Sequence, residues 1–272
     1  MNGRAKTYFR RLNISLPWLK IALIILMVMS VRFVAQARPQ VFEDIEAANY
    51  VAAPMIRHVK VPERPWRNLT GKKLVALTFD DGPSEYTTPQ LLDILREKNV
   101  PVTFFALGSM MQNQPEIVLR EIEEGHEVES HTMWHQNLAN ISYDDVVSDL
   151  EQAKEVYQEI LGYEPRFIRP PYGSYDYKLE ENAGVPLITW SVDSLDWKYM
   201  DTESILDYGQ RYLEDGGIVL MHDIHQTTVD AVAEYIDVLR DNGFEFVTVA
   251  ELISLRKATV EPGVVYGSFH QE

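Results

Sequence analysis

Two adjacent carboxylates follow an apolar run near residue 80. The segment VALTFDDGPS, residues 75–84, has the pattern of a buried strand that ends in Asp80 and Asp81 and then turns at Gly82 and Pro83. Burying a charge is costly unless another group pairs with it, so the aspartate pair indicates a site. One carboxylate could bind a metal ion, and the other could act as a general base toward water beside that ion.

Two histidines are spaced to bind the same ion. His131 and His135 lie four residues apart in SHTMWH, and a helical turn would place both imidazoles on one face. Two histidines and one carboxylate leave coordination positions open, which is typical of a catalytic rather than a structural zinc site.

Apolar runs alternate with helical patterns from residue 72 onward. The strand-like runs are KLVALTF, VTFFAL, HEVES, RFI, PLITWSV, GIVLMH and FEFVTV. Apolar residues recur at helical spacing over residues 89–98, 115–124, 143–161, 202–213 and 228–242. This alternation predicts a mainly parallel α/β sheet, open or closed into a barrel.

Polar segments follow several of these runs, at the strand ends where parallel α/β folds build their active sites. Besides the aspartate and histidine pairs, these segments are RPPYG at 169–173, DSLDW at 193–197 and MHD at 221–223. We therefore expect them to meet at one rim of the sheet.

The N-terminus has the pattern of an export segment. Residues 1–42 carry seven Lys or Arg and no Asp or Glu, and residues 21–31, IALIILMVMSV, are almost wholly apolar. This run is too short to span a bilayer alone, and Arg32 closes it, so residues 1–37 are predicted to be a signal peptide cut near AQA, or an uncleaved membrane anchor. Residues 38–71 are predicted to be a linker, and the protein is expected outside the cytoplasm.

Composition excludes several classes of function. Beyond residue 42 the chain holds 18 Lys or Arg against 41 Asp or Glu, a net charge of −23. Such an acidic body argues against nucleic acid as a partner and is compatible with a neutral polymer. The absence of cysteine excludes a thiolate metal site and a cysteine nucleophile.

Five segments together resemble a known family. TFDDGP, SHTMWH, RPPYG, DSLDW and IVLMHD are similar, in order, to the motifs of the polysaccharide deacetylases, the NodB homology domain of carbohydrate esterase family 4. The resemblance covers residues 72–257, taken as the catalytic domain, with 258–272 as a tail. Residues 221–231, MHDIHQTTVDA, especially resemble peptidoglycan N-acetylglucosamine deacetylases of Gram-positive bacteria. The resemblance implies a distorted (β/α) barrel, here with about seven parallel strands.

The resemblance also implies a metal site and a base. Asp81, His131 and His135 would hold a divalent metal, most often Zn²⁺, with Co²⁺ or another ion as alternatives. Asp80 would activate water as the base, and Arg169 would pair with Asp80 and favour its ionised form.

The remaining implied roles concern the leaving group and the substrate. His222 would be the general acid, oriented by Asp196, with Asp193 as a less favoured orienter. The backbone N–H of Tyr172 would stabilise the oxyanion. The pocket for the acetyl methyl group would be lined by two residues that also fit ordinary core positions, Trp197 and Leu220.

One residue departs from the family pattern. In GHEVESH, Glu129 stands two residues before His131, where the family usually has a small residue. Its carboxylate would either point to solvent or add negative charge near the site and tighten metal binding. The other histidines are interpreted as ordinary ones: His58, His126, His225 and His270.

The expected function is metal-dependent removal of acetyl groups from N-acetylglucosamine in cell-wall peptidoglycan by a monomer, secreted or held at the membrane by its N-terminus. Chitin-type oligosaccharides or O-acetylated xylan are alternative substrates. A glycan-binding wall protein without catalysis is an alternative from another class, which a missing base or ligand would favour.

Overall fold

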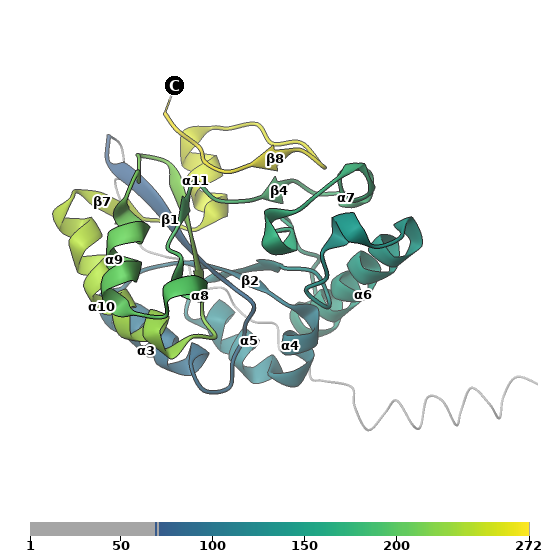
Figure 1. Cartoon of the computed structure of the whole chain (residues 1–272), viewed down its shortest axis with the longest axis horizontal. Coiled ribbons are helices and arrows are strands. Elements are labelled where there is room, and N and C mark those ends of the chain that lie inside the picture. Colours follow the sequence, from purple (N-terminus) through teal and green to yellow (C-terminus); the bar gives the residue numbers. More distant parts are fainter. Residues whose placement is uncertain (1–68, 70, 272) are drawn as a thin grey trace, which may run out of the picture. The chain divides into compact units, whose positions relative to one another are not determined.

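The computed structural model describes residue 69 and residues 71–271 (Figure 1). The export segment expected at 1–37, and the linker expected at 38–71 apart from residues 69 and 71, lie outside the described residues. Among the described residues, no helix is long and apolar enough to cross a bilayer.

A parallel sheet forms the centre of the described fold. Its strands are β1 (Lys73–Asp80), β2 (Thr103–Ala106), β3 (Glu127–Ser130), β5 (Val192–Asp193), β6 (Gly217–His222) and β7 (Phe244–Phe246). Their order is β3-β2-β1-β6-β5, with β7 also paired to β1, and every pairing is parallel. In the register of β1 and β6, Asp80 stands directly opposite His222. The carboxyl ends of the strands therefore bring together residues far apart in the sequence.

The central strand β1 is buried on both faces. Its alternate side chains enter two different apolar clusters. One cluster contains Val75, Leu77 and Phe79, and the other contains Leu74 and Ala76. A continuous apolar run is what a parallel strand covered on both faces requires. This explains why the apolar run of β1 continues up to Asp80.

A second, two-stranded sheet pairs β4 (Leu187–Ile188) with β8 (Val265–Tyr266) in parallel. The strand expected at RFI is reduced to single-residue bridges from Ile168 to Ser130 and Leu187. The strand expected at PLITWSV is divided because the chain changes partners. The Thr189 N–H donates to Tyr266 O of β8 (2.8 Å), whereas the Ser191 N–H donates to Ile218 O of β6 (3.0 Å). The mainly parallel α/β class is confirmed, and the expected set of strands is corrected at these two places.

Helices cover the sheet where the sequence places them. The predicted helices are α3 (Thr88–Lys98), α5 (Pro115–Glu123), α6 (Tyr143–Leu161), α9 (Thr202–Gln210) and α10 (Gln226–Asp241). Figure 1 shows α10 beside α9 and α3, in agreement with their contacts. Within residues 71–271, four α-helices were not predicted because they are too short for a clear helical period: α4 (Gly108–Asn113), α7 (Tyr177–Asn182), α8 (Asp196–Tyr199) and α11 (Val249–Arg256).

The segment that the sequence marks as a tail packs into the fold. Residues 265–266 form β8, Ser268 bridges to Gly217 of β6, and Phe269 is only 6% exposed within an apolar cluster. Gly216 has a φ of +88°, and a Cβ there would lie 2.0 Å from the Phe269 carbonyl oxygen. The described residues beyond 257 thus contribute to the core.

Phe269→Ala is therefore expected to lower the free energy of unfolding by about 3 kcal/mol, because it removes a buried aromatic side chain and leaves a cavity. Urea unfolding followed by circular dichroism would measure the change. A loss below about 0.5 kcal/mol, the size of an ordinary surface substitution, would contradict the packing of this segment.

Candidate active site

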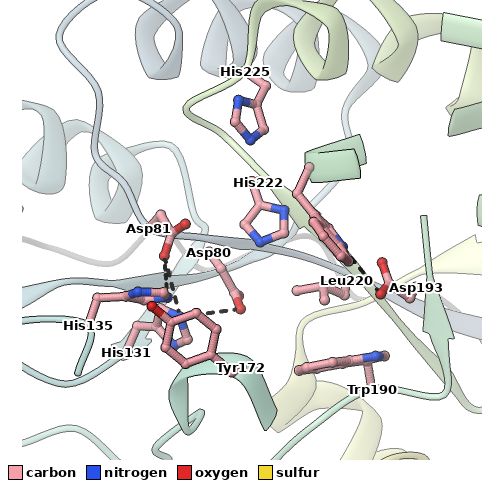
Figure 2. Close-up of a pocket in the computed structure, with 11 residues that line it drawn as sticks. Asp80, Asp81, His131, His135, Tyr172, Trp190, Asp193, Leu220, His222 and His225 are labelled. Atoms are coloured by element: carbon pink, nitrogen blue, oxygen red, sulfur yellow. Dashed lines mark hydrogen bonds and ion pairs between the residues drawn. The ribbon is translucent and has the colours of Figure 1, made fainter. Parts of the chain in front are cut away.

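A pocket of about 430 Å³ opens at the carboxyl ends of the strands. Nine of the residues given a role from the sequence line it: Asp80, Asp81, His131, His135, Tyr172, Asp193, Trp197, Leu220 and His222. Figure 2 shows Asp81, His131, His135 and Tyr172 on one side of the pocket and Trp190, Leu220 and Asp193 on the other. Two further residues are fully buried behind the lining. Arg169 contacts Asp80, and Asp196 contacts His222.

Three potential metal ligands converge on one side of the pocket. Asp81 Oδ1 lies 3.4 Å from His131 Nε2 and 3.2 Å from His135 Nε2. Suitable ligand atoms of all three residues lie within 4.8 Å of one another. The helical turn expected for the histidines is not formed. Positive φ angles at Thr132 (74°) and His135 (56°) instead fold a loop that brings the two rings to 5.0 Å between centroids.

The donor atoms of this cluster fit a divalent cation. Asp81 Oδ1 is buried and has no hydrogen-bond partner among the described residues. His131 Nδ1 lies 2.8 Å from the carbonyl oxygen of Arg169, so we assign the proton to Nδ1, which leaves the Nε2 lone pair facing Asp81. A buried carboxylate oxygen next to two imidazole nitrogens is a donor set suited to zinc or a similar ion.

Protonation states also suit metal binding. Burial acts to raise the pKa of Asp81, but contact with His131 and the charges of nearby histidines outweigh it and lower the pKa to about 2. Burial lowers the pKa of His135, although Asp81 opposes this shift. At neutral pH the site therefore offers an ionised carboxylate and a neutral imidazole, the forms that bind a metal.

Asp80 is held by a fully buried arginine. Arg169 Nη1 donates to Asp80 Oδ1 at 2.6 Å and to Thr78 Oγ1 at 2.7 Å. The rest of the guanidinium donates to the carbonyl oxygens of Ile188 and Thr189. All three guanidinium nitrogens donate hydrogen bonds, so the charge of Arg169 is tolerated in the interior. The hydrogen bond from Nη1 fixes the orientation of Asp80. The other carboxylate oxygen of Asp80 lies 3.7 Å from His131 Nε2, next to the potential metal ligands.

His222 is oriented by Asp196, the first of the two candidates. Its Nδ1 lies 2.8 Å from Asp196 Oδ1, and its backbone N–H donates to Asp196 Oδ2 at 2.7 Å. Thr228 also donates to Asp196. Asp193, the less favoured orienter, instead accepts from the backbone N–H of Leu195.

This arrangement favours a protonated His222. Burial acts to lower the pKa of His222, but the hydrogen bond and charge of Asp196 outweigh it and raise the pKa to about 9. Since Nδ1 is bound to Asp196, the Nε2–H is the group left to act in the pocket. A proton donor is thus present at neutral pH, in the same pocket as the three potential ligands.

The pocket walls are partly apolar. The Tyr172 ring packs against His135, with 4.7 Å between centroids, and its backbone has a φ of 62° within a short 3₁₀ turn, Pro171–Gly173. Leu220 is almost fully buried and Trp197 is half exposed. Sequence reasoning missed two lining residues, Trp190 and His225. Trp190 lies where the chain changes sheets, and His225 two residues after the recognised MHD segment.

Glu129 is buried and does not point to solvent. It is 0% exposed, accepts from the backbone N–H groups of Arg166 and Phe167, and pairs with Arg166 Nε at 3.0 Å. Glu127 binds the same guanidinium. Burial, followed by the charge of Glu127, raises the pKa of Glu129 to about 8. The expected solvent exposure is therefore wrong, because Arg166 and two backbone N–H groups hold the buried carboxylate.

Comparisons of the sequence find one family. The sequence profile described as polysaccharide deacetylase matches residues 67–185. The peptidoglycan-N-acetylglucosamine deacetylase PgdA of Listeria monocytogenes is 44% identical over 194 residues, 71% of this chain and 41% of that protein. The peptidoglycan-N-acetylmuramic acid deacetylase PdaC of Bacillus subtilis is 38% identical over 68% of this chain and 40% of that protein. The chain thus spans about two fifths of the length of these two relatives.

A shorter relative is matched over most of its length. A Bacillus cereus peptidoglycan-N-acetylglucosamine deacetylase is 36% identical over 69% of this chain and 92% of that protein. Among solved structures, B. subtilis PdaC superposes with a TM-score of 0.66 at 37% identity, over 69% of this chain and 93% of that chain. A family 4 acetyl xylan esterase from Clostridium thermocellum, in complex with a cobalt ion, gives a TM-score of 0.68 at 32% identity, over 72% and 98% of the two chains.

Proposed function

The chain belongs to the polysaccharide deacetylase family, and on that premise we propose that it removes acetyl groups from N-acetylglucosamine residues of peptidoglycan by metal-dependent hydrolysis. One observation carries the proposal. A three-ligand cluster, a carboxylate held by a buried arginine and a histidine held by a buried aspartate line a single pocket. The missing base or ligand that would favour a binding protein without catalysis is not found, since every required side chain is present.

Asp81, His131 and His135 would hold the metal ion. A divalent metal bound there would act as a Lewis acid that polarises the acetyl carbonyl and makes water easier to deprotonate. We propose zinc, because two imidazoles and one carboxylate with open positions are typical of catalytic zinc. The cobalt ion in the acetyl xylan esterase makes cobalt the alternative.

Different residues act on the attacking water and on the leaving group. Asp80, oriented by Arg169, takes a proton from the water that attacks the acetyl carbonyl carbon. The backbone N–H of Tyr172 is proposed to donate to the oxyanion that forms. His222 gives its Nε2 proton to the departing sugar nitrogen, so acetate and a free amine are released. The acetyl methyl group is proposed to rest against Leu220 and Trp197, in the apolar part of the pocket.

Replacing Asp196, the hydrogen-bond partner of His222, tests the assignment of His222 as the general acid. In Asp196→Asn, the pKa of His222 is expected to fall from about 9, because the charge and hydrogen bond that raise it are weakened. His222 would then lose its proton at lower pH, and activity would decline earlier on the alkaline side. The measurement is kcat/KM between pH 6 and 10 for both proteins. An unchanged alkaline limb would contradict the role of His222 as acid.

Family relatives guide the choice of polymer. Two of the relatives are named as N-acetylglucosamine deacetylases of peptidoglycan, and PdaC is named as an N-acetylmuramic acid deacetylase of peptidoglycan. This supports peptidoglycan as the substrate and a place outside the cytoplasm. From the sequence pattern, we also propose a signal peptide or membrane anchor at 1–37, a linker at 38–71 and a catalytic domain within 72–257. The distorted barrel of the family is supported by the Ile168 bridges between β3 and β4.

Acetate release from three polymers would test the proposal. Residues 38–272 with added zinc would be incubated with N-acetylated peptidoglycan, chitin oligosaccharides and O-acetylated xylan. We expect peptidoglycan to give the highest kcat/KM. A preference for chitin oligosaccharides or xylan would keep the chemistry and contradict the polymer, whereas no release from any would contradict the deacetylase activity.

A further inference from the structure

A buried aspartate outside the pocket contacts the loop that carries both histidines. Asp149 lies on α6 and is only 3% exposed. Its Oδ1 accepts a hydrogen bond from the backbone N–H of Met133 at 2.8 Å. Met133 lies midway in the sequence between His131 and His135, two of the three potential metal ligands. The proposed reaction gives Asp149 no role, so its contact with this loop needs another explanation.

The loop between the two histidines has a backbone that needs support from outside. Thr132 (φ 74°) and His135 (φ 56°) adopt left-handed backbone, which residues other than glycine adopt only rarely. Such conformations persist where surrounding contacts hold them in place. One set of contacts comes from the start of α4. The Gly108 N–H donates to the Thr132 carbonyl oxygen at 2.9 Å, and the Ser109 N–H donates to the Met133 carbonyl oxygen at 3.2 Å.

Asp149 supplies a contact from a second helix. It accepts from the N–H of Met133, whose carbonyl oxygen is already bound by α4, so both backbone polar groups of Met133 are paired. The Met133 side chain is 3% exposed within an apolar cluster. Figure 1 shows α4 close to α6, in agreement with their contacts. The middle of the loop is therefore held between these two helices.

The Asp149 carboxylate is directed at the loop backbone. Burial raises its pKa, and hydrogen bonds from the backbone N–H groups of Met133 and Trp134 oppose this shift. Its other oxygen, Oδ2, is buried and has no hydrogen-bond partner within the part of the chain that the structure describes. A buried N–H that loses its acceptor is costly. Without Asp149, the Met133 segment would therefore move to pair its N–H elsewhere, and the two histidines would move with it.

We propose that Asp149 is a positioning residue that fixes the spacing of His131 and His135 through the Met133 backbone and thereby sets the metal affinity of the site. It acts without touching the ion or the substrate. The inference rests on the proposed function, because it concerns the proposed metal site, and it deepens that function by placing one determinant of metal binding on α6.

Zinc affinity in matched variants tests the inference. Asp149→Ala removes the acceptor, so the Kd for zinc should rise about tenfold, as for the loss of an outer partner of a metal ligand. Asp149→Asn keeps an oxygen that can accept from Met133, and its Kd should stay within about threefold of the wild type. The control is Asp144→Ala, an exposed position near the start of the same helix, with an expected Kd equal to the wild type. Competition with a chromogenic chelator measures all four proteins.

Cobalt bound in place of zinc reports the geometry of the site. The visible absorption of Co²⁺ depends on the arrangement of its ligands, so Asp149→Ala should change this spectrum at saturating metal, whereas Asp149→Asn should preserve it. A role in stability alone would lower the melting temperature of metal-free Asp149→Ala. It would leave the zinc affinity and the cobalt spectrum of the folded protein unchanged.

Amide exchange in the wild-type protein provides a test that does not depend on how a variant folds. In the metal-free wild type, the N–H of Met133 should exchange at least about a hundredfold more slowly than an unstructured amide, because Asp149 holds it. Nuclear magnetic resonance would measure this rate.

The outcomes separate the inference from the proposed function. Zinc affinity and a cobalt spectrum equal to the wild type in folded Asp149→Ala would overturn the inference alone, as would a Met133 N–H that exchanges at the unstructured rate. A wild-type protein that binds no zinc and no cobalt would overturn the proposed metal-dependent function, and the inference with it.

Discussion

Asp80→Asn is expected to lower kcat for acetate release by about a thousandfold, the scale of general base catalysis. Asparagine keeps the shape of the side chain and an oxygen that can accept from Arg169, but its amide cannot take a proton from water. The proposed metal ligands Asp81, His131 and His135 are left in place. The measurement is kcat with zinc-loaded protein, together with zinc content by elemental analysis.

A matched substitution shows whether the effect belongs to the pocket. Asp93→Asn removes a carboxylate that forms ion pairs with Arg96 and Arg120 on the exposed side of α3, and its kcat should equal that of the wild type. If Asp80→Asn retains more than about a tenth of wild-type kcat while it binds zinc, another group is the base.

His131→Ala is expected to weaken zinc binding by at least about a hundredfold, more than the loss of an outer partner of a metal ligand usually costs. This ring offers one of the three proposed ligand atoms, and the substitution leaves only two of them. Acetate release should fall with zinc occupancy. The measurement is zinc affinity by competition with a chromogenic chelator, followed by activity at saturating zinc.

His270→Ala is the matched control for this experiment, because it removes an imidazole from outside the pocket. Zinc affinity equal to the wild type is expected for it. Should His131→Ala bind zinc as tightly as the wild-type protein, the three-ligand cluster would not be the metal site.

The position of the site was predictable because it depends on strand ends. The run of β1 ends in Asp80 and Asp81, and β6 ends in His222, so parallel pairing alone brings Asp80 opposite His222. The resemblance to a family then assigned Arg169 to Asp80 and Asp196 to His222, and the structure shows both contacts. Polar residues at the ends of strands thus predicted where the site lies.

Features that depend on exact loop geometry were not predictable. The histidine pair was expected on a helical turn, but left-handed backbone at Thr132 and His135 brings the rings together instead. Trp190 lines the pocket at the point where its segment stops hydrogen-bonding to β8 and begins to hydrogen-bond to β6. No local pattern in the sequence predicts such a change of partner strand.

Glu129 and the C-terminal segment show the same limit for tertiary contacts. The partner of Glu129, Arg166, is 37 residues away, so its burial could not be foreseen from GHEVESH. The core position of Phe269 depends on its hydrogen bond to Gly216 and on packing with distant residues. A sequence predicts that a residue can be buried, but the contacts that bury it come from the whole fold.

One titration tests the central claim most directly. Metal-free protein, residues 38–272, would receive increasing zinc while acetate release from N-acetylated peptidoglycan is measured. The account predicts no release without metal, a rise that is complete at one zinc per chain, and loss of activity on adding chelator. Full acetate release by the metal-free protein would contradict it.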